Sequence, residues 1–474
     1  MKTYICLLWV VFGCIGWEMH ASVEIRSNKL TTGDGLANNS IRYMFQDSKG
    51  FMWMGTVNGL SYYDGNSFVS IYPDPNLPIS LADPRIRNME EDSNGFLWIA
   101  TLSSLYSCYD LKHGRFVDFT GCGEYKQSYS KKIIASDQSI WLWDNNNGCR
   151  RVVYQDGQFS SQAYKKELGN LSSDEVLFVY ESNDSPGHVW IGTKQGLWKY
   201  HDGKLEAMDT QGESWEHIFS YDQYTCIITG KKEIYRHSLS NNRLEKIASL
   251  TELGDTGVIT GSLRLQHQWV MFTATGSYIL DPVTGKLRRF SRLNIKNGNV
   301  TRDNKGNAWV HNYTGNVWYV NTSTGDIKHF QFLSSEHLGY IDVERYSIIH
   351  DSRDIIWITT YGNGLFAYDL NTGDLQHFTF EVSHSSHINS NYLQYIIEDR
   401  SGGIWVSSEF SGLSHLEILN KGTLRIYPNG EDASDRSNTI RMLLRGKNGN
   451  VYMANRMGTL YEYDADLKNI LRRE

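Results

Sequence analysis

The sequence predicts an all-β fold assembled from repeated copies of one unit. In the first copy, residues 46–64, Asp and a Gly turn precede an apolar-Trp-apolar run, a small residue and Thr. A second turn, Gly-Leu, an aromatic residue and another Asp follow. The order returns about every 44 residues, a period typical of four-stranded propeller blades. The copies are centred on Trp53, Trp98, Trp141, Trp190, Ile227, Val270, Trp309, Trp357, Trp405 and Tyr452.

Within the first copy, the alternation of apolar and polar residues predicts strands at 40–47, 51–56, 60–64 and 67–72. Asp-Ser-Lys-Gly, Val-Asn-Gly and Asp-Gly-Asn supply the turns between them. A single four-stranded sheet cannot bury both of its faces, so neighbouring copies must stack and close into a ring. We therefore interpret the recurring Trp as packing between blades, and the small residue near it as room for the next blade.

Seven copies, beginning near Ser40, are the simplest ring, which gives a seven-bladed propeller over residues 22–332. A boundary is expected at residues 332–333. Three further copies, over residues 333–474, would be an incomplete second propeller. Residues 23–30 resemble the outer strands that precede later copies, so they should complete the last blade of a ring. A single ten-bladed ring is the alternative.

The first 21 residues have a short basic start and an apolar centre, which predicts a secretory signal peptide cut after Ala21. Lipidation at Cys14 and an uncleaved membrane anchor are alternatives, although Phe12 is bulky for a lipoprotein signal. Elsewhere Cys108, Cys122, Cys149 and Cys226 form no close pair, so neither a metal site nor a disulfide framework is predicted.

Net charge and composition exclude one class of partner. The 474 residues carry a net charge of −7 and show no basic stripe, so direct nucleic-acid binding has no electrostatic support. The chain lacks the G-x-S-x-G, H-E-x-x-H, P-loop and dinucleotide-binding motifs, and we predict neither an enzyme nor a cofactor. Carboxylate pairs that would cleave a glycan remain open, because their spacing is set in three dimensions.

The repeats closely resemble the two-component regulator propeller repeats of the periplasmic half of Bacteroides-type hybrid two-component systems. Residues 31–41 (TTGDGLANNSI), 47–56 (DSKGFMWMGT) and 58–60 (NGL) carry the resemblance. It implies two seven-bladed propellers before an immunoglobulin-like sandwich, a membrane helix, a histidine kinase and a receiver. It also implies a homodimer that responds to oligosaccharides. This sequence ends within what would be the second propeller and contains no kinase motif, so kinase activity is expected only in a longer form.

The default ligand site of a propeller is the end of its channel where the innermost strands begin, because residues from every blade converge there. Arg and aromatic side chains in these segments can bind the hydroxyls, acidic groups and faces of a sugar. Recurring arginines favour an acidic or sulfated sugar. Alternatively, these arginines pair with carboxylates such as Glu90 and Asp342 or face water, and Trp215 packs in the core. The candidates are Arg42, Arg87, Trp215, Arg345, Tyr392 and Arg441.

Together these features favour an extracytoplasmic, periplasmic sensor region that binds an oligosaccharide and signals to a kinase outside this chain. Two alternatives remain: a secreted propeller enzyme acting on a glycan, and a standalone periplasmic binding module.

Overall fold

The computed structural model describes residues 23–474 except 121–128, 183–184, 210–212, 232, 240, 242, 256–257, 304, 313–315, 332–346, 381–387, 420–425, 427, 429–435, 466 and 468. The predicted signal peptide, the boundary expected at residues 332–333 and Cys122 therefore lie outside the described residues. The described strands form ten four-stranded sheets, and the paired strands whose register is defined run antiparallel.

Blades 1 to 3 are the three sheets formed by β2–β13 in chain order. Their strands are β2 (Ile41–Gln46), β3 (Met52–Thr56), β4 (Leu60–Tyr63), β5 (Phe68–Ile71), β6 (Ile86–Glu91), β7 (Phe96–Thr101), β8 (Tyr106–Asp110), β9 (Arg115–Val117), β10 (Lys131–Ile134), β11 (Ile140–Trp143), β12 (Cys149–Gln155) and β13 (Gln158–Tyr164).

Blades 4 to 6 follow in the same manner. Their strands are β14 (Val176–Glu181), β15 (Val189–Thr193), β16 (Gly196–His201), β17 (Lys204–Asp209), β18 (Trp215–Asp222), β19 (Thr225–Gly230), β20 (Glu233–Ser238), β21 (Arg243–Ser249), β22 (Gly261–Leu265), β23 (Gln268–Phe272), β24 (Ser277–Leu280) and β25 (Leu287–Arg289).

Blades 7 and 8 are formed by β26–β33, and blade 9 combines β34–β36 with the N-terminal strand β1. The strands are β26 (Asn299–Arg302), β27 (Ala308–His311), β28 (Asn316–Val320), β29 (Ile327–Gln331), β30 (Ser347–His350), β31 (Ile355–Thr359), β32 (Leu365–Asp369), β33 (Leu375–Phe378), β34 (Leu393–Glu398), β35 (Ile404–Ser408), β36 (Leu413–Leu419) and β1 (Glu24–Leu30).

The tenth sheet contains β37 (Ile440–Arg445), β38 (Val451–Asn455), β39 (Leu460–Tyr463) and β40 (Ile470–Arg473). Short 3-10 helices occur at η1 (Thr32–Asp34), η2 (Leu250–Leu253), η3 (Ser291–Leu293) and η6 (Arg436–Asn438). The chain divides into two compact units. The larger unit comprises Ile25–Ala367 and His377–Ile418, and the smaller unit includes Leu419–Glu474 and Tyr368–Gln376.

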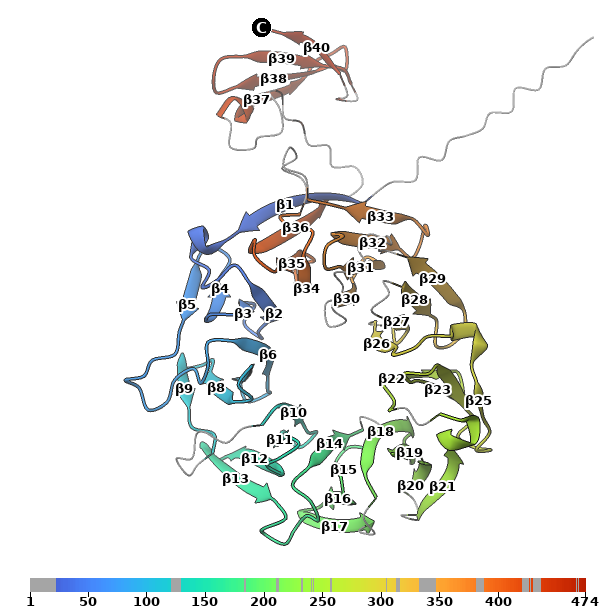
Figure 1. Cartoon of the computed structure of the whole chain (residues 1–474). Coiled ribbons are helices and arrows are strands. Elements are labelled where there is room, and N and C mark those ends of the chain that lie inside the picture. The colour runs from blue at the N-terminus through green and yellow to red at the C-terminus, as the bar shows by residue number, and fades with distance from the viewer. Residues whose placement is uncertain are drawn as a thin grey trace, which may run out of the picture. The chain divides into compact units, whose positions relative to one another are not determined.

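Blade 9 closes the larger unit onto blade 1, and Figure 1 shows the sheets from β2 to β36 arranged in a ring with β1 beside β36. The backbone N–H of Arg400 donates to Gln46 Oε1 at 2.9 Å. In the first junction Ser48, at the position equivalent to Arg400, donates in the same way to Glu91 at 2.6 Å. The closing junction thus repeats the chemistry of an internal one.

The all-β propeller class is confirmed, but the division into seven blades and three further blades is not. A seven-bladed ring would place β1 beside β29, whereas β1 completes the sheet of β34–β36. The reason is physical: the closing junction uses the same local contacts as an internal one, so the repeat determines the structure of a blade but not the number of blades. Strands β1–β36 form nine sheets, and the following strands β37–β40 form a tenth.

The Asp and Trp of the repeat form a buried hydrogen-bonded pair. The Trp53 indole N–H donates to Asp47 Oδ2 at 2.8 Å, and the backbone N–H of Phe51 donates to Asp47 Oδ1 at 2.9 Å. One carboxylate therefore fastens the turn to the second strand. Three further pairs have the same geometry: Asp92 with Trp98 (2.8 Å), Asp351 with Trp357 (2.9 Å) and Asp399 with Trp405 (2.7 Å).

The Trp rings pack between blades, which confirms the packing interpretation. The ring of Trp53 lies 5.5 Å from that of Tyr109 in blade 2. Trp405 of blade 9 lies 5.8 Å from Tyr63 of blade 1, at the equivalent position of the closing junction. The small residue near the Trp is also required, because a Cβ on Gly55 would lie 2.5 Å from a side-chain carbon of Ile86 in blade 2.

Candidate functional site

A β-bulge recurs at the second residue of several inner strands, at what we call the leading end of the channel. In β2 the register shifts between Ile41 and Tyr43, and in β6 between Ile86 and Asn88. Bulges change the direction of a side chain relative to the regular sheet. Arg42 and Arg87 are the bulged residues, so their recurring offset in the sequence reflects a repeated backbone feature.

The two arginines lack strong carboxylate partners. Arg42 is half-exposed and lies 3.7 Å from Glu409 of blade 9. Arg87 is exposed and makes no ion pair with the described residues. The carboxylate of Glu90, which the alternative interpretation offered to these arginines, pairs instead with Lys132 of blade 3. Both guanidinium groups therefore remain able to bind an anion.

Lys131 of blade 3 extends this cationic row and was missed in the sequence. Its ammonium group donates to the carbonyl of Leu177 in blade 4 at 3.3 Å. Burial lowers the pKa of Lys131, and the positive charge of Arg87 lowers it further. The signal available in the sequence was the pair Lys131–Lys132, which begins the inner strand β10 ten residues before the Trp of its repeat. Repulsion between adjacent cations is relieved when an anion binds them.

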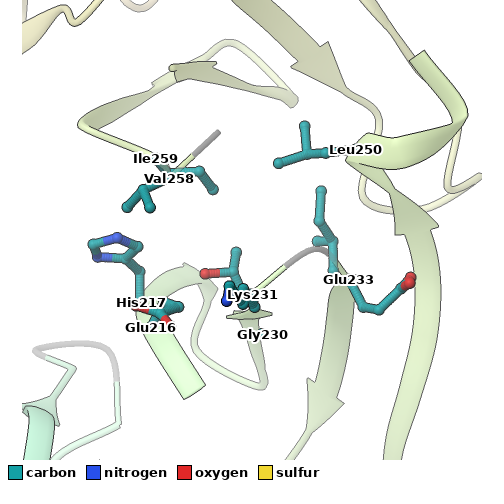
Figure 2. Close-up of a pocket in the computed structure, with 10 residues that line it drawn as sticks. Glu216, His217, Gly230, Lys231, Glu233, Leu250, Val258 and Ile259 are labelled. Carbon is teal, nitrogen blue, oxygen red and sulfur yellow. The ribbon is translucent and has the colours of Figure 1, made fainter. Parts of the chain in front are cut away.

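His217 of blade 5 lies at the same end, beside a small cavity of about 10 Å³. Figure 2 shows its imidazole facing Val258 and Ile259, with Leu250 and Glu233 across the cavity. Burial lowers the pKa of His217, Glu216 opposes that shift, and Lys131 adds to it. The ring is therefore neutral at neutral pH. The cavity has room for about one water molecule and none for a sugar.

The remaining sequence candidates fall in different places. Trp215 is 1% exposed and packs in the core of blades 4 and 5, so its ring offers no platform for a sugar. Tyr392 is 46% exposed, stacks edge-on against Tyr361 at 5.2 Å, and its carbonyl accepts from the backbone of Glu409. Arg345 and the proposed partner Asp342 lie outside the described residues. Arg441 occupies a bulge of β37, in the smaller unit.

Glu409 thus links two candidates, because it contacts Arg42 through its side chain and Tyr392 through its backbone. Arg42, Arg87 and Lys131 lie near the beginnings of the inner strands β2, β6 and β10 of three consecutive blades, and Tyr392 directly precedes the inner strand β34 of blade 9. This arrangement can bind an anion through two guanidinium groups and an ammonium group, and it can stack a flat apolar face on an exposed phenol ring.

Two negative findings concern only the described part of the chain. No group of three or more His, Cys, Asp or Glu side chains there could hold a metal ion. Within the same residues, no helix combines the length and the apolar character needed to cross a membrane. Cys108, Cys149 and Cys226 are buried and free of disulfides.

Three similar solved structures come from two bacterial species. The extracellular domain of BT3049 of B. thetaiotaomicron, described as a hybrid two-component system, is 16% identical, with a TM-score of 0.37 over 96% of this chain and 67% of its own. That of BT4673, described as a one-component system, is 16% identical, with a TM-score of 0.39 over 95% of this chain and 61% of its own. PorZ, a surface component of the type-IX secretion system of Porphyromonas gingivalis, is 11% identical, with a TM-score of 0.33 over 94% and 75%.

The chain therefore spans about three fifths of the BT4673 domain. No curated protein matches the sequence. Two segments, residues 35–58 and 80–103, match the model of the two-component regulator propeller family. Each segment begins before the inner strand of its blade, β2 or β6, and ends after the Trp-bearing strand, β3 or β7. The chain carries repeats of the two-component regulator propeller family.

Proposed function

We propose that this chain is the ligand-sensing region of a hybrid two-component sensor and acts outside the cytoplasm. Two family repeats in blades 1 and 2 support a role in two-component regulation. Among the described residues, no group of His, Cys, Asp or Glu side chains could hold a metal ion.

The proposed ligand is an oligosaccharide that carries carboxylate or sulfate groups and binds at the leading end of the channel. The observation that carries this proposal is the row of weakly paired cations on adjacent inner strands, Arg42, Arg87 and Lys131. Guanidinium groups bind carboxylates and sulfates through paired hydrogen bonds. Tyr392 would stack on the face of a neighbouring sugar ring.

Signalling in this proposal requires partners. A homodimer would pass ligand binding, through altered geometry of its subunits, to a histidine kinase module across the membrane. The chain itself would lie in the periplasm and have no direct contact with nucleic acid.

The test is calorimetric titration of the protein with sulfated and uronate-containing oligosaccharides, alongside their neutral counterparts. Arg42→Ala and Arg87→Ala should each weaken binding of the anionic ligand about tenfold, because each removes a charge-assisted hydrogen bond. Arg115→Ala, on the outer strand of blade 2, is the matched control and should leave the affinity unchanged. Unaltered binding by both site variants would reject the leading end, and turnover of the oligosaccharide would favour an enzyme.

A further inference from the structure

A cleft of about 490 Å³ lies at the junction of blades 3 and 4, at the turn end of their inner strands. This is the opposite end from Arg42 and Arg87, because its lining residues lie at the last residues of the inner strands β10 and β14 and in the turns that follow them. Its volume falls within the range of small-molecule sites in proteins. Ile133, Tyr180 and Pro186 supply apolar surface.

The cleft occurs where two neighbouring repeats lack the buried Asp. Ala135 lies six residues before Trp141, as Asp47 does before Trp53, and Ser182 follows Glu181 as Asp47 follows Gln46. Both Ala135 and Ser182 line the cleft. Two carboxymethyl groups that would occupy this region in complete repeats are therefore replaced by smaller side chains, which leaves space beside the turns.

The polar side of the cleft is held in place before any ligand binds. The Glu181 carboxylate of blade 4 accepts from the Ser136 backbone at 2.5 Å and from Ser136 Oγ at 2.7 Å. It also accepts from the backbone of Gly187 at 2.6 Å. Gln138, which accepts from Ser93 of blade 2, completes this side. A fixed set of hydrogen-bonding groups reduces the entropy lost on binding.

The lining chemistry selects the class of ligand. No Arg, Lys or His is among the described residues that line the cleft, and Glu181 repels anions. Hydroxyl groups can donate to Glu181 and both donate to and accept from Gln138, while the apolar face of a sugar ring can lie against Tyr180. We infer that the cleft between blades 3 and 4 is a second binding site, which takes an uncharged sugar unit. This inference does not depend on the ligand proposed for the leading end.

The experiment uses the whole chain and a panel of uncharged sugars: glucose, galactose, mannose, xylose, N-acetylglucosamine and their disaccharides. Hydrogen–deuterium exchange should show protection in the turns β10–β11 and β14–β15, and calorimetry should give the affinity. Galacturonate and inorganic sulfate are the anionic comparison and should give no protection there. Arg42→Ala and Arg87→Ala should leave sugar binding in the cleft unchanged, which separates this site from the proposed function.

Ala135→Asp is the decisive variant, because it fills the cleft and offers the Trp141 indole the acceptor found in four other blades. It should weaken sugar binding about tenfold or more while raising the melting temperature, so a loss of binding cannot result from unfolding. Ala207→Asp, on the exposed outer strand of blade 4, adds the same charge away from the cleft and should bind normally. Should Ala135→Asp fail to fold, Ser182→Asp replaces it.

Three outcomes would overturn the inference. They are absence of protection by every uncharged sugar, protection by the anionic compounds alone, and full binding by a folded Ala135→Asp or Ser182→Asp variant.

Discussion

Blades 1, 2, 8 and 9 differ from blades 3 and 4 in one buried hydrogen bond. In the first group an Asp accepts from the indole of the blade's Trp at 2.7 to 2.9 Å. In the second group Ala135 and Ser182 stand in its place, and the buried indole N–H groups of Trp141 and Trp190 have no hydrogen-bond partner among the described residues. Each unpaired donor costs about 1–3 kcal/mol of stability.

The difference shows which contacts the ring requires. Blades 3 and 4 lack the Asp, yet Ser136 of blade 3 still bonds Glu181 of blade 4, as Ser48 bonds Glu91 and Ser352 bonds Glu398. The Ser–Glu hydrogen bond between neighbouring blades is therefore kept at blades 3 and 4, although the Asp–Trp hydrogen bond within each of these blades is absent. The ring tolerates incomplete blades away from its closure, whereas both closing blades are complete.

The largest expected effect comes from making a closing blade incomplete. Removing residues 23–30 deletes β1, which exposes the edge of β36 and the apolar surface beneath Ile25. We expect a loss of more than about 4 kcal/mol, seen as a markedly lower melting temperature by tryptophan fluorescence. An unchanged melting temperature would mean that β1 does not close the ring.

The second effect tests the Asp itself. Asp47→Ala removes the acceptor of the Trp53 indole and of the Phe51 backbone, leaving buried donors unpaired. Chemical denaturation should show a loss of about 3 kcal/mol. Glu167→Ala, at an exposed carboxylate, is the control and should change stability by less than about 0.5 kcal/mol. An equally small effect of Asp47→Ala would remove the distinction between the two groups of blades.

The third effect is a dependence of stability on pH that Asp399, the repeat Asp of blade 9, should contribute. Burial opposes ionisation of Asp399, but the imidazole of His415 at 3.6 Å and the hydrogen bonds from Ser401 and Trp405 outweigh it and hold the pKa of Asp399 well below its usual range. A carboxyl whose pKa is lowered by folding stabilises the protein above its unfolded pKa and loses that contribution as the pH falls. Melting temperatures should therefore drop below about pH 4, and less steeply in Asp399→Asn. Identical acid profiles would contradict this assignment.

The smallest expected effect is an increase in the stability of the protein. Ser182→Asp supplies an acceptor beside the unpaired Trp190 indole, and it should stabilise the protein by about 1 kcal/mol in denaturant titrations. The turn after Ser182 is two residues longer than the one after Asp47, so this gain should be smaller than that of Ala135→Asp. A loss of stability would show that the indole already has an acceptor in solution.

The sequence predicted the individual blade well because its signals are local. The strands expected at 40–47, 51–56, 60–64 and 67–72 correspond to β2, β3, β4 and β5. The alternation of apolar and polar side chains, together with the turns that contain Gly, locates each strand to within a few residues. The number of blades could not be predicted, because β1 pairs with a strand nearly 400 residues away and the closing junction has the same chemistry as an internal one.

Part of the candidate site could be predicted, because that part also depends on local features of the repeat. Arg42 and Arg87 each lie at the same distance in sequence before the Trp of their repeat, and this spacing is visible in the sequence. Both are the bulged residues of their inner strands, which explains the recurrence. Lys131 was missed because blade 3 lacks the bulge, so its offset differs. Trp215 could not be distinguished from a surface aromatic without knowing which side chains cover it. The cleft between blades 3 and 4 arises from absent side chains at two positions, which no motif reports.

Thiol cross-linking tests the nine-bladed ring most directly. Cysteines at Gln46 and Arg400 should be joined by a short bifunctional thiol reagent, because the two residues meet at the closing junction. Cysteines at Gln46 and Lys305 form the comparison pair, since Lys305 lies in the corresponding turn of blade 7. Intact-mass and peptide analysis should find the first link and not the second. A link between positions 46 and 305, without one between 46 and 400, would contradict the nine-bladed ring and restore one of seven.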